Sequence, residues 1–241
     1  MLFGLVIGAV CYAVLPSYRL REGGSCFLHE AEEIGGAMNS SIADYIHDVQ
    51  FNQSIFQAIG ELFRKNNHEG TWLHCIKVAQ EAKQLAVRFG YSPEAAELAG
   101  WLHDIGTIIP NEEKIAVAQS YGVEVLEGEA RFPYILHQKI SKAMSQDIFQ
   151  ISDNELLNAI ACHTTLRPNS SLLDKILFVA DKLSWDHSDA APYLMEMRRS
   201  LDMSLEEAAK IYLTHVWDNR MQMKVVHPWL AEAYQELTNG A

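Results

Sequence analysis

Apolar residues recur at steps of three and four positions through most of the chain from Asp48 onward. Ile55, Ile59, Leu62 and Phe63 follow this spacing, which places apolar side chains along one face of an α-helix. No segment shows a convincing strand pattern, in which polar and apolar residues would alternate. The pattern predicts an all-α fold, a bundle of helices.

Capping residues predict where several of these helices begin and end. Residues 71–89 form a broad apolar face that stops at Gly90, a residue suited to a helix C-terminus. Ser92 can cap the next helix, which should run into the His103-Asp104 pair. Three more helix starts are predicted by capping-box patterns, in which a serine is followed three positions later by an acidic residue. These patterns are Ser152–Glu155, Ser171–Asp174 and Ser204–Glu207.

The first 37 residues do not share this organisation. Residues 1–16 are apolar, but they are fewer than the roughly 20 needed to cross a bilayer, and no basic segment precedes them as in a secretory signal. Residues 32–37, Glu-Glu-Ile-Gly-Gly-Ala, lie directly before Met38. They are the amino acids that a purine-rich ribosome-binding site would encode if it were translated. We therefore predict that the native start is Met38, so that residues 1–37 are a leader outside the domain, and that residues 38–241 form one domain. A short membrane-associating segment and an ordered extension are the alternatives for the leader, and stable membrane insertion is not expected.

Charge and cysteine content narrow the partners and the compartment. The chain has 31 acidic and 19 basic residues and a formal charge of -12, so its surface should repel nucleic acid. Its four cysteines have neither the spacing of a zinc site nor that of a secreted disulfide framework. These features favour a reducing cytoplasm and make nucleic acid a poor candidate for a partner.

One carboxylate lies inside a segment that is apolar on nearly every side. Asp181 belongs to the predicted helix that follows Ser171, and an ionised carboxylate buried there costs several kcal/mol unless it is compensated. Lys182 is adjacent in sequence, but neighbouring residues on a helix face different ways, so it should point elsewhere. Asp181 therefore needs another partner, which could be a helix cap, an arginine or a metal ion.

Other polar residues stand at the ends of apolar helices or among aliphatic neighbours. Each histidine alone is more often a core residue than a ligand. Together, however, four histidines and two aspartates offer the nitrogen and oxygen donors that suit iron, manganese or zinc, and one aspartate can bridge two ions. The six candidate ligands are His74, His103, Asp104, His137, His163 and Asp181.

The order of these residues resembles that of the HD superfamily of phosphohydrolases. The segment 101–106 matches the superfamily's usual pattern around the HD pair. The segments 160–165 and 172–182 are similar to those of its YqeK-like branch, the symmetrical bis(5'-nucleosyl)-tetraphosphatases. The resemblance implies two metal ions, usually iron, which activate water and neutralise phosphoryl charge. It assigns His74, His103, Asp104 and Asp181 to one ion and Asp104, His137 and His163 to the other.

The same resemblance implies the substrate contacts. Thr164, Thr165 and Arg167 match the branch's H-T-T-G-R stretch, in which hydroxyls and a guanidinium suit phosphate oxygens. Asp104, as the bridging ligand, and Arg167, which would steady the leaving phosphate, are the candidate catalytic residues. The implied reaction cleaves diadenosine tetraphosphate into two ADP. The threonines could instead cap the end of the preceding helix.

Several departures from the branch keep other functions open. Gly106-Thr107 stands where a lysine is common, Leu166 replaces a glycine, and residues 184–187 lack the usual Glu and Arg. One alternative is a different HD activity, on nucleoside monophosphates or on guanosine alarmones. The other is a non-catalytic module that binds metal and nucleotide.

The remaining features have simpler interpretations. A group of methionines should fill the core, and a contact between subunits, as in a homodimer, is the alternative. Asp186 and His187 are expected in a solvated loop, and His68, His215 and His227 receive no role. The methionines are Met195, Met197, Met203, Met221 and Met223.

Overall fold

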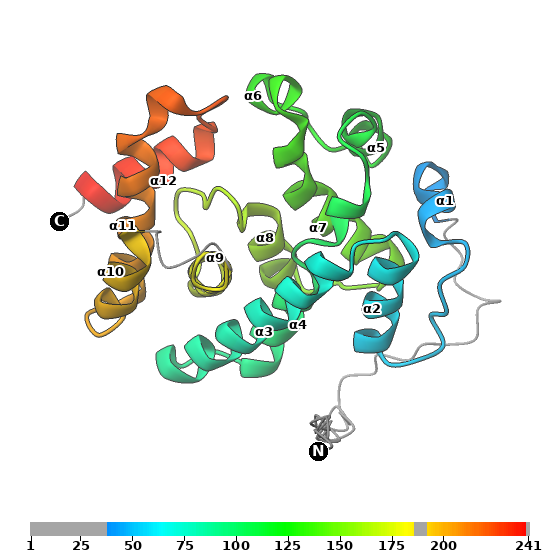
Figure 1. Ribbon diagram of the computed structural model, residues 1–241, viewed down its shortest axis with the longest axis horizontal. Helices are drawn as coiled ribbons and strands as arrows, with labels where there is room; N and C mark the ends of the chain where they lie inside the picture. Colours follow the sequence, from blue (N-terminus) through cyan, green and yellow to red (C-terminus); the bar gives the residue numbers. More distant parts are fainter. Residues whose placement is uncertain (1–37, 186–191, 240–241) are drawn as a thin grey trace, which may run out of the picture. The chain divides into compact units, whose positions relative to one another are not determined.

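The computed structural model describes residues 38–185 and 192–239, and within these ranges it contains helices and no β-strand (Figure 1). The predicted all-α fold is confirmed. Residues 1–37, Asp186 and His187 lie outside the described residues. The α-helices are α1 (Ala43–Ile46), α2 (Ile55–Lys65), α3 (Glu69–Phe89), α4 (Pro93–Leu102), α5 (Lys114–Ser120), α6 (Glu127–Arg131), α7 (His137–Ile148), α8 (Asn154–Cys162), α9 (Leu172–Leu183), α10 (Pro192–Ser200), α11 (Leu205–Asp218) and α12 (Pro228–Asn239). Short 3-10 helices are η1 (Ser40–Ile42), η2 (Ile105–Ile108), η3 (Pro133–Leu136) and η4 (Arg220–Gln222).

Helix α9 forms the centre of the described fold. Figure 1 shows it end-on, and it packs against α3, α4, α8, α10 and α11. From Leu173 to Leu183 every side chain except Lys175 is buried. A helix that is apolar on all sides is expected in such a position. The sequence-based prediction for this segment is confirmed, and Asp181 is buried with it.

Local capping explains most of the helix boundaries. α3 ends at Phe89, where Gly90 adopts a left-handed conformation with φ of 76°. Ser92, Ser171 and Ser204 cap α4, α9 and α11 as predicted, each accepting a hydrogen bond from a first-turn amide. The start of α8 differs, because Asp153 caps it instead of Ser152. The Asp153 carboxylate accepts from two amides, those of residues 155 and 156.

Two glycines allow the close packing that gathers the polar ends of the helices. A Cβ at Gly100 would lie 2.4 Å from the Cα of Ala79, so α4 packs backbone to backbone on α3. At Gly106, a Cβ would lie 2.5 Å from the His137 carbonyl oxygen. The turn after α4 is therefore pressed against the start of α7, which brings Asp104 close to His137.

The prediction that the methionine group fills the core is wrong for most of its members. Met197 is fully buried, but Met195, Met203 and Met221 expose between 69% and 88% of their surface, and Met223 exposes 38%. Helical spacing alone does not reveal which face of a C-terminal helix is covered. Among the residues that the structure describes, no helix has the length and apolar character required to span a membrane.

Candidate metal centre

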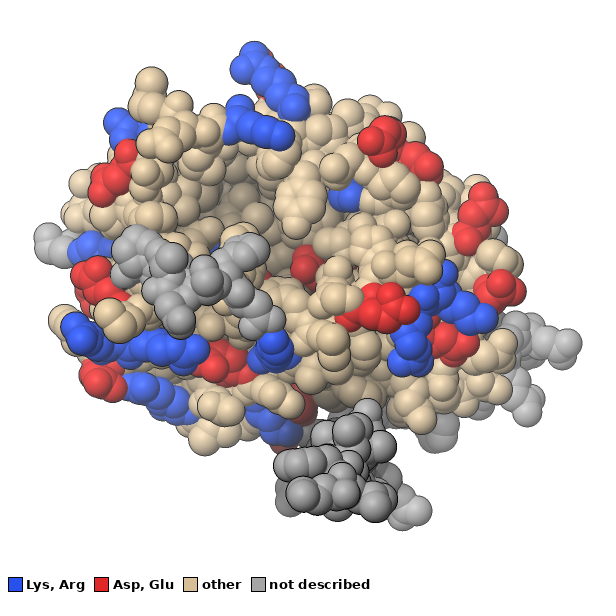
Figure 2. Space-filling view, in the orientation of Figure 1, with Lys and Arg blue, Asp and Glu red and all other residues tan. Residues whose placement is uncertain are grey.

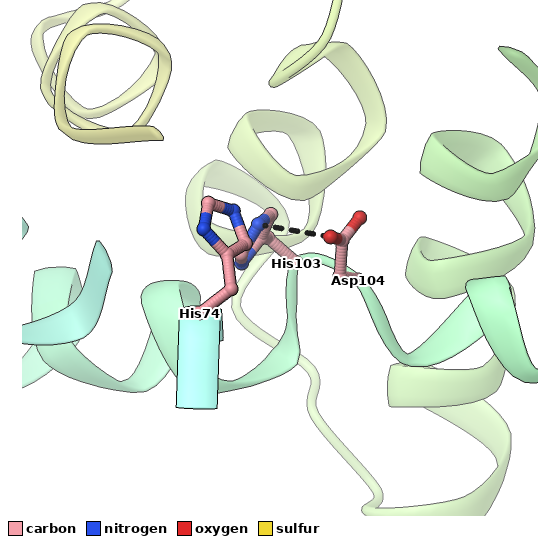
Figure 3. A group of neighbouring side chains, drawn as sticks. All are labelled: His74, His103 and Asp104. Carbon is pink, nitrogen blue, oxygen red and sulfur yellow. Dashed lines mark ion pairs between the residues drawn. The ribbon is translucent and has the colours of Figure 1, made fainter. Parts of the chain in front are cut away.

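Six side chains from five helical segments converge beside α9. His74 comes from α3, His103 and Asp104 follow the last residue of α4, and His137 begins α7. Two subsets could each hold a metal ion, with candidate ligand atoms within 4.8 Å of one another, and Asp104 belongs to both. Figure 3 shows His74, His103 and Asp104 pointing toward one another. The first subset is His74, His103 and Asp104, and the second is Asp104, His137 and His163.

The two carboxylates link the imidazoles into one cluster. Asp104 Oδ1 lies 3.2 Å from His137 Nε2 and 3.4 Å from His163 Nε2, while its Oδ2 lies 3.5 Å from His103 Nε2. Asp181 Oδ1 lies 2.9 Å from His74 Nε2 and 3.8 Å from His103 Nε2. The structure thus brings together all six predicted ligands, including Asp181.

Backbone carbonyls set the orientation of three of the rings. The Nδ1 atoms of His103, His137 and His163 lie 2.7, 2.6 and 2.8 Å from the carbonyl oxygens three residues earlier. A carbonyl only accepts, so each Nδ1 carries the proton. In a neutral ring Nε2 then has a free lone pair, as a metal ligand requires. These lone pairs all face the interior of the cluster.

The resulting arrangement places acceptors against acceptors. His137 Nε2 and His163 Nε2 are 3.1 Å apart, although neither carries a proton in the neutral tautomer. His103 Nε2 and Asp104 Oδ1 are buried without any hydrogen-bond partner. Buried polar atoms of this kind are costly unless something compensates them. A bound cation would satisfy every one of them, so the donor set fits a metal centre.

Burial and charge keep the groups in the states that metal binding needs. Burial lowers the pKa of His163 to about 4 and also lowers the pKa of His103, which favours the neutral form of both rings. Burial disfavours the charged form of Asp104, but His103, His137 and His163 outweigh it and hold the pKa of that carboxyl well below its usual range. Burial thus favours neutral imidazoles at His103 and His163, and the three surrounding imidazoles favour an ionised carboxylate at Asp104.

Asp181 also has two partners on its own side of the cluster. Lys182 Nζ donates to Asp181 Oδ2 at 2.5 Å, and Trp185 Nε1 donates to Asp181 Oδ1 at 3.1 Å. The expectation that Lys182 points elsewhere is wrong. Its ammonium is buried near the Phe178 and Tyr212 rings, at 5.1 and 5.4 Å, so its flexible stem turns back to the nearest carboxylate.

The predicted substrate residues occupy different settings. Thr164 Oγ1 lies 3.1 Å from the Nε2 atoms of both His137 and His163, so its hydroxyl belongs to the cluster. Thr165 is buried and donates to the Leu166 carbonyl. The Arg167 guanidinium donates through Nε to Asp174, 2.8 Å away at the start of α9. Only Thr164 of these three is in contact with the histidines.

A second buried network was not predicted from the sequence. Glu129 of α6 is fully buried between Lys139 of α7, at 2.8 Å, and His227, at 3.2 Å. It ties the segment before α12 to α6 and α7. No pattern along the chain connects residues as far apart as Glu129 and His227.

Figure 2 shows the molecular face in this view hollowed near its middle, with most charged side chains around the edge.

Comparison with known proteins agrees with this geometry. The model of the HD domain matches residues 71–186, which include all six candidate ligands. An uncharacterised protein of Lactococcus lactis subsp. cremoris is 43% identical over 148 residues, 61% of this chain and 75% of that protein. A Bacillus subtilis protein named symmetrical bis(5'-nucleosyl)-tetraphosphatase is 30% identical over 142 residues, 58% of this chain and 74% of that protein.

A solved structure shares the architecture. The crystal structure of a predicted HD superfamily hydrolase involved in NAD metabolism, from Clostridium acetobutylicum, matches with a TM-score of 0.72 and 27% sequence identity. The match covers 78% of this chain and 100% of that chain. By its sequence relatives and its fold, this chain belongs to the HD superfamily of phosphohydrolases, in the branch that includes proteins named symmetrical bis(5'-nucleosyl)-tetraphosphatase.

Proposed function

We propose that this HD-domain phosphohydrolase cleaves diadenosine tetraphosphate symmetrically, releasing two ADP. The observation that carries the proposal is the pair of ligand groups that share Asp104, because two adjacent cations suit a chain of anionic phosphates. The name of the Bacillus subtilis relative points to the same substrate class. In the reaction, water adds to one of the two central phosphorus atoms and the oxygen bridging them leaves with the other phosphate.

The proposed centre holds two ions, for which we favour iron. His74, His103, Asp104 and Asp181 would bind one, and Asp104, His137 and His163 the other. When bound, such ions supply an activated water and neutralise charge on the phosphoryl group. The main-chain carbonyls that hold the rings of His103, His137 and His163 would orient them for this task before any ion arrives.

Other side chains would tune charge and hold the phosphates. Lys182 offsets the charge of Asp181, which lets a buried carboxylate stay ionised beside the cluster. The Thr164 hydroxyl, placed between His137 and His163, can turn toward a phosphate oxygen. Arg167 is anchored through Nε to Asp174, and we propose that its terminal nitrogens steady the leaving phosphate.

Product analysis tests this function against its alternatives. The full chain, reconstituted with iron or manganese without oxygen, is incubated with diadenosine tetraphosphate, a nucleoside monophosphate and a guanosine alarmone. ADP as the sole product of the first substrate supports the proposal. Release of inorganic phosphate or pyrophosphate from the other substrates favours another HD activity, and nucleotide binding without turnover favours a non-catalytic module.

We also propose a cytoplasmic location, in keeping with free thiols such as the buried Cys75 and Cys162.

A further inference from the structure

A surface pocket opens beside the metal centre, between α3, the end of α9 and α10. Its volume is about 290 Å³, and its walls include Lys77, Gln80 and Gln84 of α3, Trp185 after α9, and Arg198 of α10. Ligand pockets typically hold about 300–1,000 Å³, so this one suits a single nucleoside and is too small for a whole dinucleotide. None of the residues assigned to metal or phosphate contacts lines it.

Trp185 joins this pocket to the cluster. Its indole Nε1 donates to Asp181 Oδ1 at 3.1 Å, while 40% of the residue surface remains exposed. Within the described ranges, Tyr134 and Trp185 are the two aromatic residues with large exposed surfaces. An aromatic ring held in place by a hydrogen bond at its edge can present a face to a planar ligand.

A row of polar side chains on helix α3 leads away from the candidate metal centre. His74, Lys77, Gln80 or Glu81, and Gln84 recur at three and four residue steps and thus lie along one side of the helix. With a rise of about 1.5 Å per residue, Lys77 stands about 4.5 Å and Gln84 about 15 Å beyond His74 along the axis. This side of the pocket therefore presents the Lys77 ammonium nearer the cluster and the glutamine amides farther from it.

The opposite wall contributes a cation, and the α3 wall contributes amides. Arg198 donates to the Leu183 carbonyl at 3.2 Å and lies 3.7 Å from a Glu81 carboxylate oxygen, so its guanidinium is fixed over the pocket. Glutamine amides carry both donors and acceptors, which matches the edge of a purine. A ring face combined with amide edges is the chemistry by which proteins bind bases.

We propose that this pocket binds one purine base of the substrate, stacked on Trp185 and contacted at its edge by Gln80 and Gln84. The phosphates attached to that base run past Lys77 toward His74 and Asp104. This assignment rests on the proposed function for the identity of the substrate.

Binding of a product and of its phosphate portion tests the pocket without requiring turnover. The metal-loaded full chain is titrated with ADP and, separately, with inorganic pyrophosphate by calorimetry. We expect Trp185→Leu to weaken ADP binding about tenfold, in line with the loss of one stacked base. Pyrophosphate binding and metal content should stay within twofold of the wild type. Trp185→Phe, which keeps a ring but loses the bond to Asp181, should restore most of the ADP affinity.

Two further variants provide matched comparisons on α3. Gln84→Ala removes a pocket amide far from every candidate ligand and should weaken ADP alone, whereas Val87→Ala, one turn later and 68% exposed, should change neither ligand. Equal weakening of ADP and pyrophosphate in Trp185→Leu would place Trp185 in support of the metal centre and overturn the pocket. So would unchanged ADP binding. If ADP binding depends on Trp185 but diadenosine tetraphosphate is not cleaved, the pocket stands and the proposed reaction fails.

Discussion

The backbone of Gly106 lies directly against the carbonyl of His137, where an added Cβ would approach that oxygen to 2.5 Å and the Ser141 amide nitrogen to 2.8 Å. The turn that carries Asp104 is thus seated on the first turn of α7. The Gly106 amide also donates to the Ser141 hydroxyl at 2.8 Å. This contact sets the distance between Asp104 and His137, two members of the second ligand group.

Gly106→Ala should therefore disturb both stability and the second ligand group. Because backbone atoms block the methyl group, we expect the free energy of unfolding to fall by about 1–3 kcal/mol, as for overpacking. Metal at His137 and His163 should be lost before metal at His74 and His103. Urea unfolding and metal analysis measure both effects. Gly70→Ala is the matched control, since no atom lies within 4 Å of its added Cβ, and a fold as stable as the wild type in Gly106→Ala would refute the seating argument.

Asp104→Ala should empty both metal positions and abolish turnover, because this carboxylate is shared by the two ligand groups. His137→Ala should remove metal from the second group and spare the first. Metal content per chain, measured after identical reconstitution, distinguishes the two results. His215→Ala, a histidine without contact to the cluster, serves as the control. Equal loss of both ions in His137→Ala would contradict the proposed division of ligands.

Thr107→Lys tests whether the polyphosphate chain passes the turn after Asp104. Thr107 is half-buried and its hydroxyl donates to the Asp104 carbonyl at 2.6 Å, so a longer side chain at this position starts beside the centre. One added charge-assisted contact at the edge of solvent contributes on the order of 1 kcal/mol. The KM for diadenosine tetraphosphate should fall more than the KM for a nucleoside monophosphate. An equal effect on both substrates, or none, means that position 107 does not face the phosphates.

Deletion of residues 1–37 tests the proposed leader. The Asn39 amide, just after Met38, donates to Asp147 of α7 at 3.1 Å. We expect the shortened chain to keep its solubility, metal content and rate. Parallel purification of both chains, with sedimentation against lipid vesicles, provides the comparison. Loss of folding on deletion would make the segment structural, and vesicle binding by the full chain alone would identify an anchor.

The helices and the convergence of the six candidate ligands were predictable because their signals are local or ordered along the chain. Ser92 and Ser204 act on amides three residues away, and spacing of three and four residues defines each apolar face. The direction of the Lys182 side chain was not predictable, because Tyr212 and Phe178 surround it only after folding. The bond between Glu129 and His227 spans 98 positions, and no short pattern encodes it.

Main-chain carbonyls accept from the Nδ1 atoms of His103, His137 and His163 and set the orientation of these imidazoles. A carbonyl is present whatever residue supplies it, so substitutions around the cluster leave this support intact. The surrounding walls, including the Trp185 pocket, can then diverge without rebuilding the cluster of candidate ligands. Such a separation lets one inherited scaffold acquire new specificities through changes at its periphery alone.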